Sequence, residues 1–194
     1  MGSAPGRGVN CLDVPSILAS EPRDTACERL AGVVACCQCE NESVQPDFSP
    51  GVVADYETLA RFVAPIDFDT ASGTVKPSLF GHARRMGMSV TRIEHAGLDG
   101  LARQQGAKGY LGYVVASCAD IREVLAEGRR GYCVYDTALQ DNPAHADICQ
   151  AMFEATAELS TAYRKLSKSE QSAIRYKLQL VFGRVPLTAG SHPS

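Results

Sequence analysis

Two short apolar segments, with a helix-forming segment between them, constrain the fold of this chain more than any other feature. Residues 110–116 (YLGYVVA) and 131–135 (GYCVY) are rich in valine and tyrosine, which favour strands. Residues 119–127 between them have helical spacing and end at Gly128. We predict that both segments are strands of one sheet and pair with each other, residues 110–116 being central. A connection of this length permits a parallel crossover.

Shorter elements are expected between residues 52 and 106. Leu59 and Phe62 stand three residues apart, and this spacing predicts a short helix over residues 55–63. Residues 65–69 and 73–76 predict a hairpin around a Thr-Ala-Ser-Gly turn. Residues 88–93 are expected to form a strand, and residues 98–105 a helix that ends at Gly106.

The last third of the chain predicts two helices. Asn142 and Pro143 have the residue types of an N-cap and a first helical position, and apolar residues follow up to Tyr163. Ser167 and Glu170 have the spacing of a capping box, for a helix that ends at Gly183. The predicted fold class is therefore α+β, with a small mixed β-sheet covered by helices and a C-terminal helical hairpin.

Composition divides the chain into three parts. Residues 1–45 are expected to form a cysteine-rich, partly disordered N-terminal appendage, because the polar, proline-containing segment 40–51 that follows is typical of a linker. Residues 46–185 are expected to form the α+β core domain with the helical pair. Residues 186–194 are expected to be a disordered tail.

The charge balance and the hydropathy pattern exclude several classes of protein. Lys and Arg total 19 and Asp and Glu total 22, a formal net charge of −3, so binding to nucleic acid through a broad basic face is not expected. There is no apolar run of about 18 residues that could cross a membrane, and no apolar secretory leader. A cytoplasmic location without membrane association is therefore predicted.

Five of the eight cysteines fall within the first 39 residues. Without an export signal, free thiols are expected rather than disulfides. Cys36 and Cys39 form a Cys-x-x-Cys pair, but a structural zinc site needs two further ligands, for which no second pair exists. A redox pair usually opens a helix, whereas this one ends a predicted helix. We therefore expect no metal and no cofactor, Cys36 and Cys39 being weak candidates for metal ligands.

The segment 140–147 (QDNPAHAD) contains the best candidates for chemistry. His145 is expected in the first turn of a helix that follows a strand, where the positive helix end would lower the pKa of its imidazole. A neutral His145 beside Asp141 could act as a general base, while Asn142 and the helix start could bind an anion. Alternatively, Asn142 only caps the helix and His145 only bonds to the backbone.

Arginines could complete such an anion site. Arg92 and Arg130 could each present a bidentate fork to a phosphate or carboxylate, provided that either of them lies near His145. The alternative for each is a solvated surface arginine.

Two functions follow from these features. The chain lacks Walker, dinucleotide-binding, nucleophile-elbow and His-Glu-x-x-His motifs. The first hypothesis is a binding module of a larger bacterial-type system, which docks an unknown protein partner through the helical pair. The second is a small enzyme for a phosphate- or carboxylate-bearing substrate, with His145 as general base and an arginine clamp. The sequence leaves open whether the chain is an enzyme.

Overall fold

The computed structural model describes residues 11–33, 38–41, 47–126, 128–151, 153–155, 161–163 and 166–188. The helices of these residues are α1 Val14–Ala19, α2 Ala26–Val33, α3 His82–Arg85, α4 Ile93–Lys108, α5 Cys118–Arg122 and α6 Lys168–Phe182. The strands are β1 Thr58–Val63, β2 Phe68–Asp69, β3 Thr74–Val75, β4 Met88–Arg92, β5 Gly112–Ser117, β6 Leu125–Ala126, β7 Arg129–Arg130, β8 Tyr132–Asp136, β9 His145–Gln150, β10 Phe153–Ala155 and β11 Thr161–Tyr163. Short 3-10 turns include η3 Gln38–Glu40 and η5 Pro77–Phe80.

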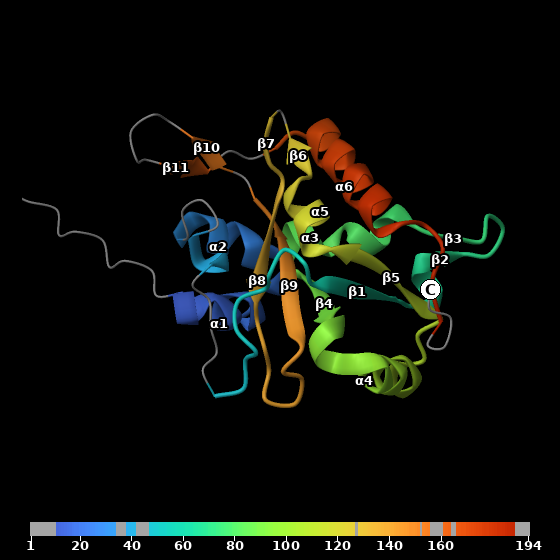
Figure 1. Ribbon diagram of the computed structural model, residues 1–194. Helices are drawn as coiled ribbons and strands as arrows, with labels where there is room; N and C mark the ends of the chain where they lie inside the picture. The colour runs from blue at the N-terminus through green and yellow to red at the C-terminus, as the bar shows by residue number, and fades with distance from the viewer. Residues whose placement is uncertain are drawn as a thin grey trace, which may run out of the picture.

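A five-stranded sheet in the order β5-β1-β4-β9-β8 forms the centre of the molecule (Figure 1). Each neighbouring pair in this sheet is antiparallel. Three two-stranded ladders lie outside it: β2 with β3, β6 with β7, and β10 with β11. The predicted α+β class is confirmed, with helices around a small sheet, but this sheet is antiparallel throughout and not mixed.

The predicted pairing of the two apolar segments is wrong. They form β5 and β8, which lie at opposite edges of the sheet, and neither the expected central position of residues 110–116 nor a parallel crossover is found. Apolar and β-branched residues specify that a segment is a strand, but a strand's neighbours depend on contacts far away in sequence. Here β1, β4 and β9 separate the two.

Residues 58–63 form strand β1 and not the predicted helix. Four of the six residues are buried, and they follow neither a strict alternation nor a helical stripe. Both faces of this strand are covered, so the alternation that identifies a half-exposed strand is absent from its sequence. The hairpin of β2 and β3 and the strand β4 agree with the predictions.

The prediction of a first C-terminal helix, beginning at Asn142 and Pro143, is also wrong. Asn142 and Pro143 lie in the turn between β8 and β9, where Leu139 and Asn142 form an isolated bridge. Five of the six residues of β9 are buried, among them the polar Asp147 and Gln150, so its sequence (HADICQ) lacks a clear strand alternation, whereas Asn142 and Pro143 have the residue types of a helix start. The second helix, α6, is present with the predicted capping box of Ser167 and Glu170 and ends at Gly183.

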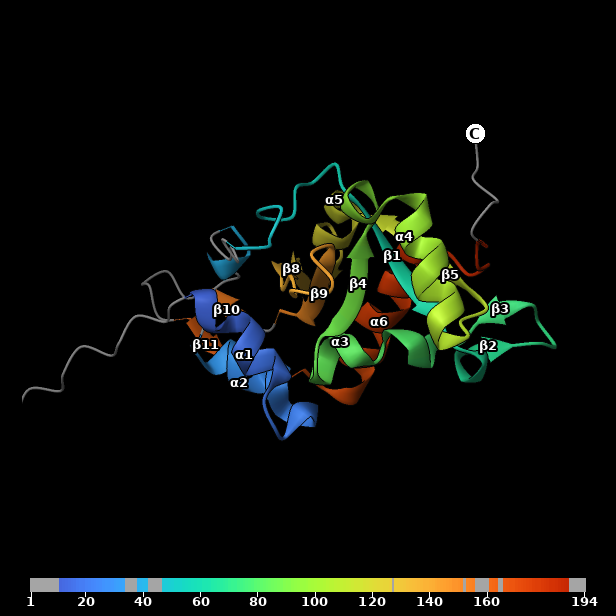
Figure 2. The same ribbon diagram turned by 90° about the horizontal axis from the view of Figure 1, so that it is seen from below.

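Helices cover both faces of the sheet (Figures 1 and 2). On one side α6 packs Ile174, Leu178 and Phe182 into the main core, together with Leu59 and Val63 of β1. On the other side α4 packs Leu101 against a small cluster formed by Ala60, Phe62 and Tyr113.

Helices α1 and α2 lie against the sheet. Leu18 of α1, together with Cys27 and Leu30 of α2, shares a buried cluster with Tyr135 of β8 and Cys149 of β9. Figure 2 shows α1 and α2 beside the β8 edge. The boundary near residue 45 remains a prediction about domain organisation, but residues 11–33 are packed rather than detached.

The segment after α6 extends the other edge of the sheet. Leu187 exchanges two backbone hydrogen bonds with Tyr113 of β5, at 2.9 Å and 2.7 Å. The expected disordered tail from residue 186 is therefore wrong at Leu187, because the open edge of β5 offers unpaired backbone groups. Residues 189–194 lie outside the described part.

Candidate functional site

His145 lines a cleft of about 520 Å³ together with Asp141 and Asn142. These three of the five predicted site residues therefore lie together. His145 is the first residue of β9 and Asn142 belongs to the preceding turn, so the expected helix end and its effect on the imidazole pKa are absent. The polar loop at this strand end, rather than a helix, positions the histidine.

The arginine in this cleft is Arg61 of β1, which the sequence analysis did not select. Its Nη1 donates to the Ser89 carbonyl at 3.0 Å, and its Nη2 lies 3.3 Å from Nδ1 of His82. Its Nε is buried and has no hydrogen-bond partner among the described residues. Burial lowers the pKa of the Arg61 guanidinium, and the charges of Asp67 and Asp147 raise it. An arginine stays protonated nonetheless, so Arg61 contributes a positive charge to the lining of the cleft.

His82 is joined to Arg61 by a hydrogen bond. An arginine has only donors, so Nδ1 of His82 must accept the hydrogen bond and its proton must be on Nε2. Although the residue as a whole is exposed, burial of the ring lowers the pKa of His82, and the neighbouring Arg61 lowers it further. His82 is thus a neutral donor near pH 7.

Hydrogen bonds also fix the tautomer of His145. Its Nδ1 lies 3.0 Å from the Thr137 carbonyl and 2.9 Å from the Thr137 hydroxyl, which itself donates to Asp147 at 2.8 Å. A carbonyl only accepts, so Nδ1 carries the proton and Nε2 is left as a hydrogen-bond acceptor.

The remaining wall of the cleft combines aromatic and polar groups. Phe62 and Tyr110 stack with ring centroids 5.1 Å apart. The Thr91 hydroxyl donates to Gln104 at 2.9 Å, and the exposed Lys108 lies in the same lining. The cleft thus offers a flat apolar surface next to cationic and neutral donors.

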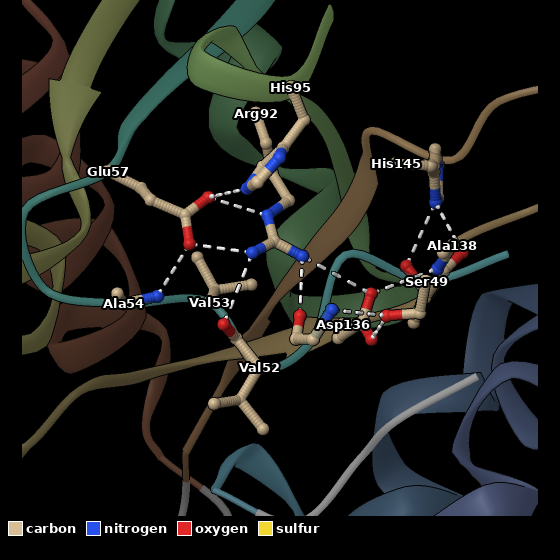
Figure 3. Close-up of polar contacts among 12 residues, drawn as sticks. Ser49, Val52, Val53, Ala54, Glu57, Arg92, His95, Asp136, Ala138 and His145 are labelled. Carbon is tan, nitrogen blue, oxygen red and sulfur yellow. Dashed lines mark hydrogen bonds and ion pairs between the residues drawn. The ribbon is translucent and has the colours of Figure 1, made fainter. Parts of the chain in front are cut away.

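Arg92 lies elsewhere, in a buried ion-pair network (Figure 3). It forms a bidentate pair with Glu57, with Nε and Nη2 each 2.6 Å from a carboxylate oxygen. Nη1 donates to the Gly51 carbonyl at 2.6 Å and lies 3.6 Å from Asp136. The Arg92 side chain is 1% exposed, and its donors are already used. Arg92 is therefore not available as an anion clamp.

Other groups tie this network to the segment before β1. Ser49 donates to Asp136, and the Ala54 N–H donates to Glu57 at 2.8 Å. Burial alone raises the pKa of Glu57, but the hydrogen bonds from Arg92 and Ala54 outweigh it and hold that pKa below its ordinary value. His95 approaches Glu57 at 3.4 Å. The network fixes residues 49–57 on the sheet.

Arg130 also has a protein partner. Its Nη1 and Nη2 lie 2.8 Å and 2.9 Å from the buried carboxylate of Glu40, which binds Arg122 at 2.7 Å as well. Glu40 further accepts from the N–H of Val134 in β8 at 2.8 Å. Arg130 therefore holds η3 against the sheet and does not reach His145's cleft.

Sequence reasoning missed Arg61, His82 and Lys108. A signal existed for Arg61, because a charged residue stands inside the apolar segment LARFV and its burial needs a reason. His82 and Lys108 come from distant segments, and only the folded chain brings them to the cleft.

The cysteines depart from the expected free thiols. Cys39 and Cys133 are each disulfide-bonded, whereas Cys27, Cys118 and Cys149 are free and buried. The expectation was wrong for Cys39 and Cys133 because η3 is packed on β8, which places both residues in one buried cluster. Cys36 lies outside the described residues. Within the described ranges, no group of three or more His, Cys, Asp or Glu side chains could hold a metal ion.

Comparison of the chain with protein-family models, with curated proteins and with solved structures found no match in any of the three. No helix in the described part of the chain is long and apolar enough to cross a membrane.

Proposed function

We propose that the cleft around Arg61 binds a small organic anion that carries a carboxylate or phosphate group. The observation that carries this proposal is the Arg61 guanidinium itself: it lines a cleft of about 520 Å³, and its hydrogen bonds within the described residues go to a carbonyl and a histidine rather than to a carboxylate. Hydrogen bonds to charged groups contribute about 1.5–3 kcal/mol, so an anion that reaches the guanidinium from the cleft would be bound strongly.

The charges of the lining suit an anion. Arg61 and Lys108 contribute two positive charges and Asp141 one negative charge, so the lining is formally +1 without its histidines. His82 adds a neutral Nε2–H donor. A guanidinium fork with a neighbouring donor matches the two oxygens of a carboxylate or phosphate.

The organic part of the ligand would lie on the aromatic wall. Phe62 and Tyr110 are stacked at an interplanar angle of 19° and present a flat apolar surface in the same cleft. The volume is within the range of about 300–1,000 Å³ that small-molecule sites occupy.

Turnover of the bound ligand is a second candidate function, and the tautomer of His145 favours it. With Nδ1 bonded to the Thr137 carbonyl, Nε2 is an acceptor that could take a proton from a ligand. Arg61 replaces Arg92 and Arg130 as the clamp in this version of the enzyme hypothesis.

Docking of a protein partner through a helical pair has less support. It requires two C-terminal helices, whereas β9 replaces the start of the first of them and α6 buries Ile174, Leu178 and Phe182 in the core. A cytoplasmic location also remains only a proposal. Disulfide-bonded Cys39 and Cys133 are more typical of an oxidising compartment, and alkylation of free thiols in freshly isolated protein would test this.

Isothermal titration of the full chain with a panel of aromatic and aliphatic carboxylates and phosphates tests the proposed function. A binding ligand should lose at least about tenfold in affinity with Arg61→Gln, the equivalent of one charged hydrogen bond. Arg103→Gln, an exposed change of equal charge outside the cleft, should keep the affinity. Equal losses in both variants, or no saturable binding across the panel, would refute the proposal.

If a ligand binds, His145→Gln separates binding from turnover. Loss of product formation with retained affinity supports the enzyme candidate. Absence of any product with the wild-type chain leaves a binding protein.

A further inference from the structure

We propose a second anion site, separate from the Arg61 cleft, that takes a phosphate group. It is a cavity of about 270 Å³ where α3, the strands β8 and β9, and the first half of α6 meet, and its lining includes Arg84, Gln150, Lys168, Gln171, Ser172 and Arg175. This inference does not rest on the proposed function of the cleft.

Three positive charges converge on this cavity. Arg84 comes from α3, whereas Lys168 and Arg175 stand seven residues apart on α6 and therefore project from the same side of that helix. No hydrogen bond or ion pair holds any of the three within the described part of the chain. Arg84 and Arg175 are half-buried, and their charges are thus only partly solvated.

No Asp or Glu is among the described residues that line the cavity, and these residues carry a formal charge of +3. The nearest acidic residue in sequence, Glu170, bonds to the Ser167 N–H at 2.6 Å as part of the capping box. Arg61, Arg92, Arg122 and Arg130, in contrast, each have a carboxylate, carbonyl or histidine partner. Three unpaired like charges around one cavity repel each other, and a bound anion would relieve that repulsion.

The charge and size of the cavity favour a phosphate over a carboxylate. A phosphate monoester carries about −1.5 to −2 charges near pH 7, closer to the +3 of the lining than a single carboxylate. Two arginine forks and a lysine are the donors that commonly bind phosphate oxygens. At about 270 Å³ the cavity suits a phosphate with a small substituent.

The buried part of the lining carries no charge. Tyr132 is 1% exposed, and burial raises the pKa of its phenol, so its hydroxyl stays protonated; Gln150 beside it is 6% exposed. This part of the lining thus places no negative charge against an incoming anion.

The two anion sites share no lining residue. Helix α3 contributes to both sites, because His82 lines the cleft and Arg84 lines the cavity. Substitutions in one site therefore leave the side chains of the other unchanged, and the two proposals can be tested separately.

Inorganic phosphate is the probe for this site, titrated into ¹⁵N-labelled full-length chain at constant ionic strength. Saturable shifts of amide signals around residues 81–84 and 168–175 are expected. The double variant Arg84→Gln with Arg175→Gln should lose at least about tenfold in phosphate affinity. The matched control, Arg85→Gln with Arg103→Gln, removes the same charge from exposed positions outside both linings and should bind as the wild type does.

Lys168→Gln is a further test should the double variant unfold, because Lys168 is exposed at the helix start and its removal should still weaken binding severalfold. Arg61→Gln should leave phosphate binding at this cavity unchanged even if it abolishes ligand binding in the cleft. Absence of saturable shifts, or equal losses in the two double variants, would overturn the proposal.

Discussion

Arg92 and Glu57 form a bidentate ion pair that is almost completely excluded from solvent. Both N···O distances are 2.6 Å, and the side chains are 1% and 2% exposed. The pair connects β4 to the residue before β1, and Asp136 of β8 lies 3.6 Å from the same guanidinium. Strands that are not neighbours in sequence are thus joined by one buried cation.

Substitution of Arg92 should strongly destabilise the protein. Arg92→Gln would leave the carboxylates of Glu57 and Asp136 buried without their cation, and removal of one partner from such a pair costs about 3–5 kcal/mol in the free energy of unfolding. Urea denaturation measures this loss, with the exposed Arg103→Gln expected to stay within about 0.5 kcal/mol of the wild type. A loss below about 1 kcal/mol would show that the network contributes little.

Stability should fall on acidification because of Glu57. Its pKa in the folded chain lies below the ordinary value of 4.5, so between these two values the unfolded chain binds more protons than the folded one. The contribution of Glu57 is therefore complete above pH 4.5 and is lost as the pH falls through the lowered pKa. Glu57→Gln should be less stable at neutral pH but should lose less on acidification. An unchanged acid slope in this variant would contradict the assignment.

Anion binding in the Arg61 cleft should strengthen as the pH falls through the range in which His82 titrates. The pKa of His82 in the free protein is below its ordinary value of 6.5, and a bound anion would raise it, so binding takes up a proton. A sulfonate probe keeps its own charge between about pH 5.5 and 7.5, which isolates the protein's contribution.

His82→Gln should flatten that pH profile. His145, the other histidine of the cleft, provides the comparison, because His145→Gln should retain the His82-dependent part of the profile. A profile that is equally steep in His82→Gln would rule out proton uptake at His82.

Two glycine substitutions should change the stability of the protein in opposite directions. A Cβ at Gly112 would lie 2.3 Å from the carbonyl oxygen of Leu187, so Gly112→Ala should push the C-terminal segment off the β5 edge and destabilise by about 1–3 kcal/mol. A Cβ at Gly106, inside α4, meets nothing within 4 Å, so Gly106→Ala should stabilise by about 0.5–1 kcal/mol. Thermal unfolding of both variants measures the difference in stability. If Gly112→Ala unfolds at the same temperature as the wild type, the C-terminal segment moves away from β5 at little cost in free energy.

Features that depend on adjacent residues could be predicted from the sequence. The capping box of Ser167 and Glu170 acts within one turn, and the chain reversal between β2 and β3 depends on four consecutive small residues. These local hydrogen bonds and backbone preferences persist in the tertiary structure.

The nature of strands β1 and β9 could not be predicted in this way. Both are buried on two faces, so their apolar residues lack the alternation that distinguishes a strand from a helix. The error at β9 moved His145 from a helix start to a strand start and removed the expected electrostatic effect on its imidazole.

The sequence by itself determined the α+β class and the last helix, and it places Asp141, Asn142 and His145 close together along the chain, because these features follow from composition and near neighbours. Only the tertiary structure decided which arginine joins them. Arg92 is held by Glu57 and Arg130 by Glu40, whereas Arg61 reaches the cleft. A charged side chain can serve a ligand only if no buried carboxylate already neutralises it, and those carboxylates are brought in by segments far away along the chain.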